Sequence, residues 1–179
     1  ELRKAFQAAV NKGITFLDTA EVYGLGKSEE LLGKFIKETN ATTQIATKYM
    51  PLPWRFRKED VADAVTASLK RLKMPSIDLY QVHFPAPSFL SQSGLMNALA
   101  DEVEQGRIKA VGVSNYNAEQ LREAHQLLAR RGVPLAVNQM RYSLITREIE
   151  TNGVLAAARE LGVTILAYSP LAQGLLTGK

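Results

Sequence analysis

Short apolar runs alternate along the chain with longer segments in which apolar residues recur at helical spacing. The runs are mostly continuous, as is typical of strands that are buried on both faces. They lie at 14–17, 44–48, 77–83, 110–114, 135–139 and 163–168. The helical patterns lie at about 1–12, 27–38, 59–73, 92–106, 118–130 and 149–161. Because helices separate all the strands, the pattern predicts an α/β fold with a parallel sheet.

A polar residue closes each predicted strand or follows it directly. These residues are Asp18, Lys48, His83, Ser114, Gln139 and Tyr168. Successive members are 25 to 35 residues apart, and 30 on average. That is the length of one strand–helix–strand step. The spacing therefore indicates structural repetition without repetition of the sequence itself.

Two architectures fit this alternation, a doubly wound sheet and a (β/α)8 TIM barrel. A dinucleotide-binding open sheet usually carries GxGxxG after its first strand, and here Gly24 and Gly26 lack the third glycine. Polar residues at every strand end favour the barrel, where the site gathers at the C-terminal mouth. Eight units need roughly 250 residues. At about 30 residues per unit, the chain contains only about six of the eight units of such a barrel.

Composition adds limits rather than a function. The 179 residues are 46% hydrophobic and 22% charged, which is ordinary for one globular core. The sequence contains no run of about 18 apolar residues, so it predicts no membrane-spanning helix. The chain has no cysteine, which excludes disulfides and thiolate metal sites and fits a reducing compartment. We expect a cytoplasmic location, or the plastid stroma if the source is a plant.

The net charge of +4 raises the question of an anionic partner. The densest basic clusters lie at 55–58 and 70–73, and solvated helix and loop faces are the simpler interpretation. No interleaved aromatic and basic pattern supports nucleic-acid binding. We expect neither a nucleic-acid nor a membrane partner, whereas a small anionic cofactor stays open.

Four residues at the first three strand ends could carry acid–base chemistry: Asp18, Tyr23, Lys48 and His83. An ammonium beside a phenol favours the phenolate and lowers the phenol pKa. A carboxylate keeps the lysine charged, and an imidazole can orient a carbonyl group or share its proton. Each residue alone has a structural interpretation, as a turn residue, a half-buried aromatic, an outward lysine or a packed histidine. Together they form a general acid for a carbonyl oxygen, with hydride attacking the carbon.

Serine-nucleophile and metal chemistry are less well supported. No GxSxG elbow is present, and Ser114 is followed by Asn115 and Tyr116 in VGVSNY. The two histidines, His83 and His125, have no carboxylate cluster with metal-ligand spacing. We expect no metal site.

Six segments in order resemble the aldo-keto reductase superfamily: FLDTAEVYG, IATK, DLYQVH, GVSNY, VNQ and AYSPL. The loop TKYMPLPWRF and the ending YSPLAQGLLTGK look most like plant and cyanobacterial members. The resemblance implies NADP(H) as cofactor. By this resemblance Tyr23 matches the proton donor, Lys48 and Asp18 match the pair that tunes it, and His83 matches the histidine that orients the substrate.

The resemblance also implies a cofactor site at the later strand ends. Ser114, Asn115 and Gln139 match the residues that hydrogen-bond the nicotinamide carboxamide, and Tyr168 matches the aromatic that stacks on its ring. The start of the loop over the pyrophosphate is matched by Ser169, Pro170 and Leu171. The residues that grip the 2′-phosphate have no counterpart in the chain, so the preference for NADP(H) over NAD(H) rests on the family.

The function that the resemblance implies is NADPH-dependent reduction of an aldehyde or ketone to an alcohol. The alternative is a cofactor-binding regulatory subunit of the same fold, such as the channel-associated β subunits. Those subunits, like the steroid double-bond reductases, have another residue at the position of His83, so a histidine here favours carbonyl reduction. The expected partner is a small carbonyl substrate.

Aromatic residues in the loops after two strands are candidates to line a substrate pocket. They are Trp54, Phe56, Phe84 and Phe89, and core packing is equally open for each. The resemblance implies that the chain corresponds to strands two to seven of the family's eight, and so to one (β/α)8 TIM barrel domain over residues 1–179 that is truncated at both ends. An unclosed sheet exposes two hydrogen-bonding edges. We therefore expect the 179 residues alone to fold poorly and to be nearly inactive.

Overall fold

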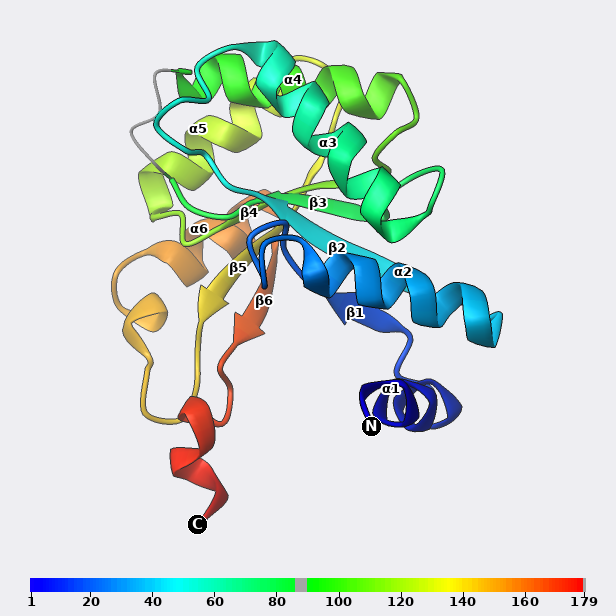
Figure 1. Ribbon diagram of the computed structural model, residues 1–179. Helices are drawn as coiled ribbons and strands as arrows, with labels where there is room; N and C mark the ends of the chain where they lie inside the picture. The colour runs from blue at the N-terminus through cyan, green and yellow to red at the C-terminus, as the bar shows by residue number, and fades with distance from the viewer. Residues whose placement is uncertain (86–89, 179) are drawn as a thin grey trace.

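A curved parallel sheet of six strands forms the centre of the molecule (Figure 1). The computed structural model describes residues 1–85 and 90–178. Neighbours in the sheet are neighbours in the sequence, in the order β1 to β6, and every pair is parallel. The strands are β1 (Phe16–Asp18), β2 (Gln44–Tyr49), β3 (Leu79–Val82), β4 (Val111–Ser114), β5 (Leu135–Arg141) and β6 (Thr164–Tyr168). The predicted α/β class and parallel sheet are thus confirmed.

Helices connect the strands and cover the outer face of the sheet (Figure 1). They are α1 (Leu2–Asn11), α2 (Lys27–Thr39), α3 (Lys58–Leu72), α4 (Gln92–Glu104), α5 (Ala118–Ala129) and α6 (Val154–Leu161), with two short 3₁₀ helices, η1 (Glu148–Glu150) and η2 (Ala172–Thr177). Within residues 1–85 and 90–178, every helix is too short or too polar to span a bilayer.

Most element boundaries lie within two residues of the sequence prediction, and the largest difference is the start of α6. The helix expected from residue 149 is interrupted, because Gly153 adopts the left-handed conformation at φ 87° and α6 begins only after it. The side chain of Asn152 accepts a hydrogen bond from the amide of Val154 and stabilises this start. The first strand begins at Phe16 rather than residue 14 and includes Asp18, which pairs with Ala46 of β2.

The hydrophobic core lies between the sheet and the helices. From the strands it includes Ile45, Val82 and Val113, and from the helices Val65 and Leu99, all with no exposed surface. Burial of each such side chain stabilises the fold by about 1.5–3 kcal/mol. Strands β2, β3 and β4 are therefore fixed most firmly, and their C-terminal ends form a rigid frame for side chains.

The packing of α2 on α3 depends on one glycine. A Cβ atom at Gly33 would lie 2.3 Å from the carbonyl oxygen of Leu72, a backbone atom that has little room to move. The two helices can approach this closely only because position 33 has no side chain.

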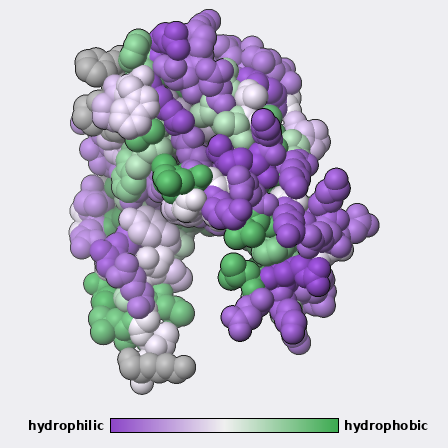
Figure 2. Space-filling view, in the orientation of Figure 1, coloured by the Kyte–Doolittle hydropathy of each residue, from purple (hydrophilic) through white to green (hydrophobic). Residues whose placement is uncertain are grey.

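The sheet is an open half-barrel rather than a closed barrel. Among the described residues no ladder joins β1 to β6, so both are edge strands. The edges are also the exposed part of the sheet, since Phe16 of β1 is 42% exposed whereas β3 and β4 are buried throughout. Figures 1 and 2 show α1 and the C-terminal segment projecting on either side of a hollow. The predicted incomplete barrel is thus what the structure contains.

Candidate active site

The C-terminal ends of the strands surround a cavity of about 270 Å³. Nine residues line it, and all were singled out in the sequence: Asp18, Tyr23, His83, Phe84, Ser114, Asn115, Gln139, Tyr168 and Ser169. They come from β1, β3, β4, β5 and β6 or from the loops that directly follow. The parallel sheet therefore brings together residues that lie up to 151 positions apart.

Lys48 lies beneath this cavity with its side chain only 1% exposed. Its Nζ atom donates hydrogen bonds to Oδ2 of Asp18 at 2.5 Å and to the carbonyl oxygen of Thr19 at 2.7 Å. Burial lowers the pKa of Lys48, and the neighbouring carboxylate of Asp18 opposes that shift. A buried ammonium group is retained only where such partners are present. The expected Asp18–Lys48 pair is therefore in place.

Tyr23 lies between Lys48 and His83. The Nζ atom of Lys48 is 5.1 Å from the centre of its ring, and the ring of His83 meets it edge-on with centres 5.7 Å apart. Burial raises the pKa of Tyr23, and the charge of Asp18 and the neighbouring Tyr168 raise it further. The sequence led us to expect that Lys48 lowers this phenol pKa, but burial, together with Asp18 and Tyr168, leaves the pKa of Tyr23 raised. The phenol accordingly keeps its proton at neutral pH and can donate it.

His83 presents a neutral imidazole to the cavity. Its pKa is lowered by burial and by the charge of Lys48. Its Nδ1 atom has no hydrogen-bond partner among the described residues, and its ring stacks on Phe84 with centres 5.0 Å apart. A neutral imidazole has one donor and one acceptor nitrogen, so it can hydrogen-bond an uncharged polar group in the cavity.

A chain of hydrogen bonds joins the ends of β4, β5 and β6. The hydroxyl of Ser114 donates to the carbonyl of Gln139, and Nδ2 of Asn115 donates to Oγ of Ser114 and to the carbonyl of His83. The hydroxyl of Tyr168 donates to Oδ1 of Asn115 at 3.0 Å. Asn115 adopts the left-handed conformation at φ 62°, which asparagine tolerates better than most residues. These bonds fix the cofactor-side residues of the predicted site.

The amide groups of Gln139 and Gln81 converge on Asp18. Nε2 of Gln139 donates to Oδ1 of Asp18 at 3.0 Å, and Nε2 of Gln81 donates to the same atom at 3.3 Å. Sequence reasoning missed Gln81. The available signal was a polar residue in the otherwise apolar and aromatic core of IDLYQVH. Gln139 leaves its Oε1 without a partner among the described residues, so a ligand in the cavity can donate to it.

The aromatic candidates for a substrate pocket separate in the structure. Phe84 lines the cavity, whereas Trp54 lines a different hollow of about 320 Å³ together with Glu21 and Arg55. Phe56 is 53% exposed and does not line the cavity. The prediction for Trp54 and Phe56 is thus not supported by their positions in the half-barrel. Phe89 lies outside the described residues.

The loop that carries Trp54 is fixed by an ion pair that the sequence did not reveal. The guanidinium of Arg55 donates to both carboxylate oxygens of Glu21, at 2.5 and 3.0 Å, and to the carbonyl of Met50 at 2.9 Å. The amide of Met50 donates to Glu21 as well, at 2.6 Å. The loops after β1 and β2 are thereby held together beside the site.

The residues predicted to follow the cofactor pyrophosphate come directly after β6. Pro170 and Leu171 follow Ser169, and the side chain of Leu171 is 57% exposed.

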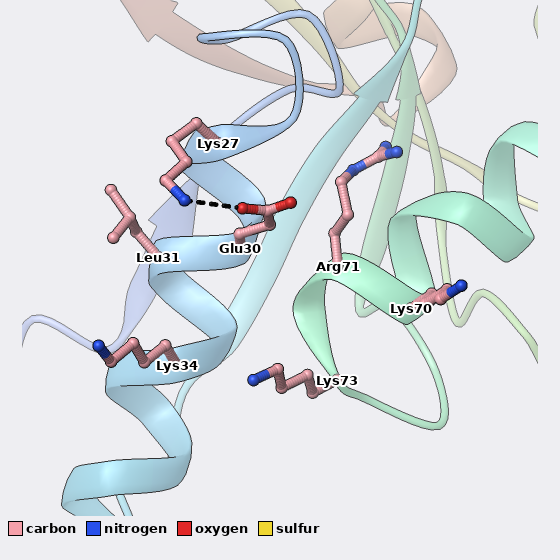
Figure 3. A pocket seen from close by; sticks show the side chains of 7 residues that line it. All are labelled: Lys27, Glu30, Leu31, Lys34, Lys70, Arg71 and Lys73. Atoms are coloured by element: carbon pink, nitrogen blue, oxygen red, sulfur yellow. Dashed lines mark hydrogen bonds and ion pairs between the residues drawn. The ribbon is translucent and has the colours of Figure 1, made fainter.

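A third and larger hollow, of about 370 Å³, lies between α2 and α3, away from the strand ends. Figure 3 shows its lining, in which Lys27 pairs with Glu30 on α2 and Lys73 extends from the end of α3 toward α2. The basic cluster at 70–73 belongs to this surface, at the C-terminal end of α3, where positive charge is favourable. The hollow contains no acid–base set, so the strand-end cavity is the candidate active site.

Comparison with known protein families identifies the family of the chain. The family model described as "Aldo/keto reductase family" matches residues 1–179. The chain belongs to the aldo/keto reductase family.

Two relatives show how much of an aldo-keto reductase the chain represents. It is 39% identical to the chloroplastic pyridoxal reductase of Arabidopsis thaliana, covering 100% of the chain and 52% of that protein. It is 40% identical to the aldo-keto reductase YhdN of Bacillus subtilis, covering 98% of the chain and 54% of that protein. The chain thus spans about half the length of the curated relatives that it matches.

Solved aldo-keto reductase structures contain the same half-barrel. The thermostable aldo-keto reductase Tm1743, solved with the inhibitor epalrestat, superposes with a TM-score of 0.87 at 35% identity, over 97% of this chain and 62% of that one. The aldo/keto reductase of Klebsiella pneumoniae, solved with NADP and acetate, superposes with a TM-score of 0.85 at 30% identity. The match covers 96% of this chain and 58% of that one. The six-stranded sheet is therefore similar to a part of these longer folds.

Proposed function

We propose that this protein reduces an aldehyde or ketone to the corresponding alcohol with NADPH, and that Tyr23 is the proton donor. One observation carries the proposal. The protonated phenol of Tyr23 lies between the ammonium of Lys48 and the neutral imidazole of His83, on the wall of a cavity. A carbonyl oxygen placed there would meet an acid, an adjacent positive charge and a hydrogen-bond donor.

Each of these residues has a distinct task in the reaction. NADPH, when bound, supplies the hydride that reaches the carbonyl carbon. Tyr23 gives its hydroxyl proton to the carbonyl oxygen, and the nearby charge of Lys48 stabilises the phenolate that forms. Asp18 holds Lys48 through the 2.5 Å contact. His83 donates a hydrogen bond to the carbonyl oxygen and fixes its orientation.

The cofactor-side residues fit a nicotinamide. A carboxamide has a donor and an acceptor, and the cavity presents the free Oε1 of Gln139 beside the polar side chains of Ser114 and Asn115. Tyr168 would stack on the ring, and Ser169, Pro170 and Leu171 would follow the pyrophosphate. The Klebsiella pneumoniae structures hold NADP or NADPH, which supports the phosphorylated cofactor for this chain.

We also propose that the six strands belong to one barrel domain in a longer chain. The structure leaves β1 and β6 as edges, and the matched proteins are about twice as long. Additional strands on these two edges would cover Phe16 and the exposed side of β6. The experiments below therefore use the full-length protein that contains this chain.

The second candidate is a regulatory subunit that binds the cofactor without significant turnover. The complete set of Asp18, Tyr23, Lys48 and His83 favours the enzyme instead. Phe84 stacks on His83 at the cavity wall and favours an aromatic carbonyl substrate. The name of the plant relative, pyridoxal reductase, points to the same class, since pyridoxal is an aromatic aldehyde.

The test follows NADPH consumption by the full-length protein with pyridoxal and with 4-nitrobenzaldehyde. The proposal requires turnover with at least one of the two aldehydes, and formation of the matching alcohol. Binding of NADPH with no turnover of either aldehyde would instead support the regulatory subunit. A parallel assay with NADH measures the preference for the 2′-phosphate.

A further inference from the structure

Gln81 is a buried polar residue that the roles above leave unexplained. It has no exposed surface and lies in β3 between Tyr80 and Val82, which are also fully buried. Its partner in the sheet register is Gly112 of β4, where a Cβ atom would lie 2.9 Å from Cγ of Gln81. The glycine therefore leaves room for the glutamine side chain inside the half-barrel.

The hydrogen bonding of Gln81 is one-sided. Its Nε2 atom donates to Oδ1 of Asp18, and its Oε1 atom has no partner among the described residues. A buried polar atom without a partner costs about 1–3 kcal/mol. An apolar residue of the same size would avoid that cost. Stability alone therefore does not account for an amide at this position.

The amide acts on a carboxylate that would otherwise be able to turn. The side chain of Asp18 is 34% exposed, whereas that of Lys48 is 1% exposed. If Asp18 rotated toward solvent, the ammonium of Lys48 would lose its counterion while remaining buried. Hydrogen bonds from Gln81 and Gln139 to Oδ1 oppose this rotation, because they keep Oδ2 directed at Lys48.

Of the two amides, only Gln81 is reserved for this contact. Gln139 lines the cavity and is assigned to the cofactor, whereas Gln81 does not line the cavity. We propose that Gln81 is a positioning residue for proton transfer, which acts through Asp18 to keep Lys48 charged and directed at Tyr23. This inference rests on the proposed carbonyl reduction.

The hydrogen bond from Gln81 to Asp18 would help Lys48 to keep its positive charge. The titratable groups around Lys48 are Asp18, Tyr23 and His83, and Tyr168 faces Tyr23 from β6. Burial lowers the pKa of Lys48 and Asp18 opposes the shift, so a displaced Asp18 would lower that pKa further. The ammonium, and with it the activity, would then be lost at a lower pH than in the wild type.

The first test is Gln81→Leu in the full-length protein, which replaces the amide by an apolar side chain of similar size. We expect kcat to fall about tenfold through misplacement of the acid, and the alkaline limb of its pH profile to move to lower pH. The Kd for NADPH should change less than twofold and the thermal midpoint should not fall. Gln44→Leu, at the exposed start of β2, is the matched control and should leave all four values unchanged.

A double-mutant cycle separates positioning from general disturbance. In an Asp18→Asn background, Gln81→Leu should cost less than a further twofold in kcat, because its target is already altered. A wild-type kcat and pH profile for Gln81→Leu, or a full additional loss in the Asp18→Asn background, would overturn the proposal.

A crystal structure of the Gln81→Leu protein gives a readout that does not depend on turnover. The proposal requires the contact between Asp18 Oδ2 and Lys48 Nζ to be lost or lengthened in that structure. An unchanged contact would overturn it. If the wild type shows no NADPH-dependent turnover, carbonyl reduction itself fails, and this crystal structure alone decides whether Gln81 positions Asp18.

Discussion

Lys48 and Asp18 are 30 residues apart in the sequence and 2.5 Å apart between Nζ and Oδ2 in the structure. They lie at the ends of neighbouring parallel strands, β2 and β1. The register pairs Asp18 with Ala46, so the long lysine side chain starts two residues further along and reaches back to the carboxylate. One strand–helix–strand step is thus sufficient to build a buried ion pair at the cavity.

Replacement of Lys48 by methionine should remove the charge that stabilises the Tyr23 phenolate. We expect kcat to fall by about 10²-fold or more, which is the contribution typical of a positioned acid–base group. The free energy of unfolding should change little, because the partly exposed Asp18 can be hydrated once its partner is gone. Steady-state kinetics and urea unfolding measure the two quantities. Lys12→Met, on an exposed lysine after α1, is the control for loss of a charge alone.

Arg55→Met should destabilise the fold because it leaves a buried carboxylate without its partner. The side chain of Glu21 is 8% exposed and that of Arg55 is 20% exposed. Breaking such a pair costs about 3–5 kcal/mol. Addition of Glu21→Gln should recover part of the loss in urea unfolding. Arg57→Met is the matched control, since Arg57 is 60% exposed and its pair with Asp60 should contribute less than about 1 kcal/mol.

Gly33→Ala should weaken the contact of α2 with α3. The added Cβ would meet the backbone carbonyl of Leu72, which can move only with its helix, so we expect a loss of about 1–3 kcal/mol. Gly94→Ala is the comparison, because its Cβ would meet the end of the flexible Leu90 side chain. Equal thermal midpoints for these two variants would contradict the packing assigned to Gly33.

Stability should decline in alkali partly because of Tyr49. Burial raises its pKa to about 12. The unfolded state loses this proton near pH 10 and the folded state only near pH 12, so the folded state binds more protons between these values. The contribution of Tyr49 is therefore fully present below pH 10 and is lost as the pH rises toward 12. Urea unfolding from pH 8 to 12 should show a shallower decline for Tyr49→Phe than for the wild type.

His83 should contribute an opposite dependence on the acid side. Burial and the charge of Lys48 lower its pKa, so the unfolded state takes up this proton first as the pH falls. Its stabilising contribution is present above the ordinary histidine pKa near 6.5 and declines below it. Unfolding measured from pH 7.5 to 5 should be less pH-dependent in His83→Phe, and an unchanged slope would contradict the lowered pKa.

Much of the arrangement of strands and helices could be predicted from the sequence, because it follows from local patterns of apolar and polar residues. The continuous apolar runs identified the buried strands, and the polar residue at each strand end located Asp18, His83 and Gln139. The end of α6 was predicted correctly, but its start was displaced by Gly153, whose left-handed conformation a helical pattern does not record.

Contacts between side chains from distant elements could not be predicted from local sequence patterns. Gln81 was overlooked because its target, Asp18, lies 63 residues away and two strands along the sheet. The raised pKa of Tyr23 depends on burial and on the distance to Asp18, and neither is encoded in residue spacing. The position of Trp54 was likewise set by a tertiary contact, the pair between Arg55 and Glu21.

The measurement that tests the central claim most directly is the single-turnover rate of NADPH oxidation in Tyr23→Phe. The full-length wild type and variant would be mixed with an aldehyde that the wild type reduces, after NADPH binding to both has been confirmed. The substitution leaves the ring beside Lys48 and His83 and removes only the hydroxyl group that donates the proton. The account predicts a fall of about 10²–10⁴-fold with unchanged NADPH affinity. Equal rates in the two proteins would contradict it.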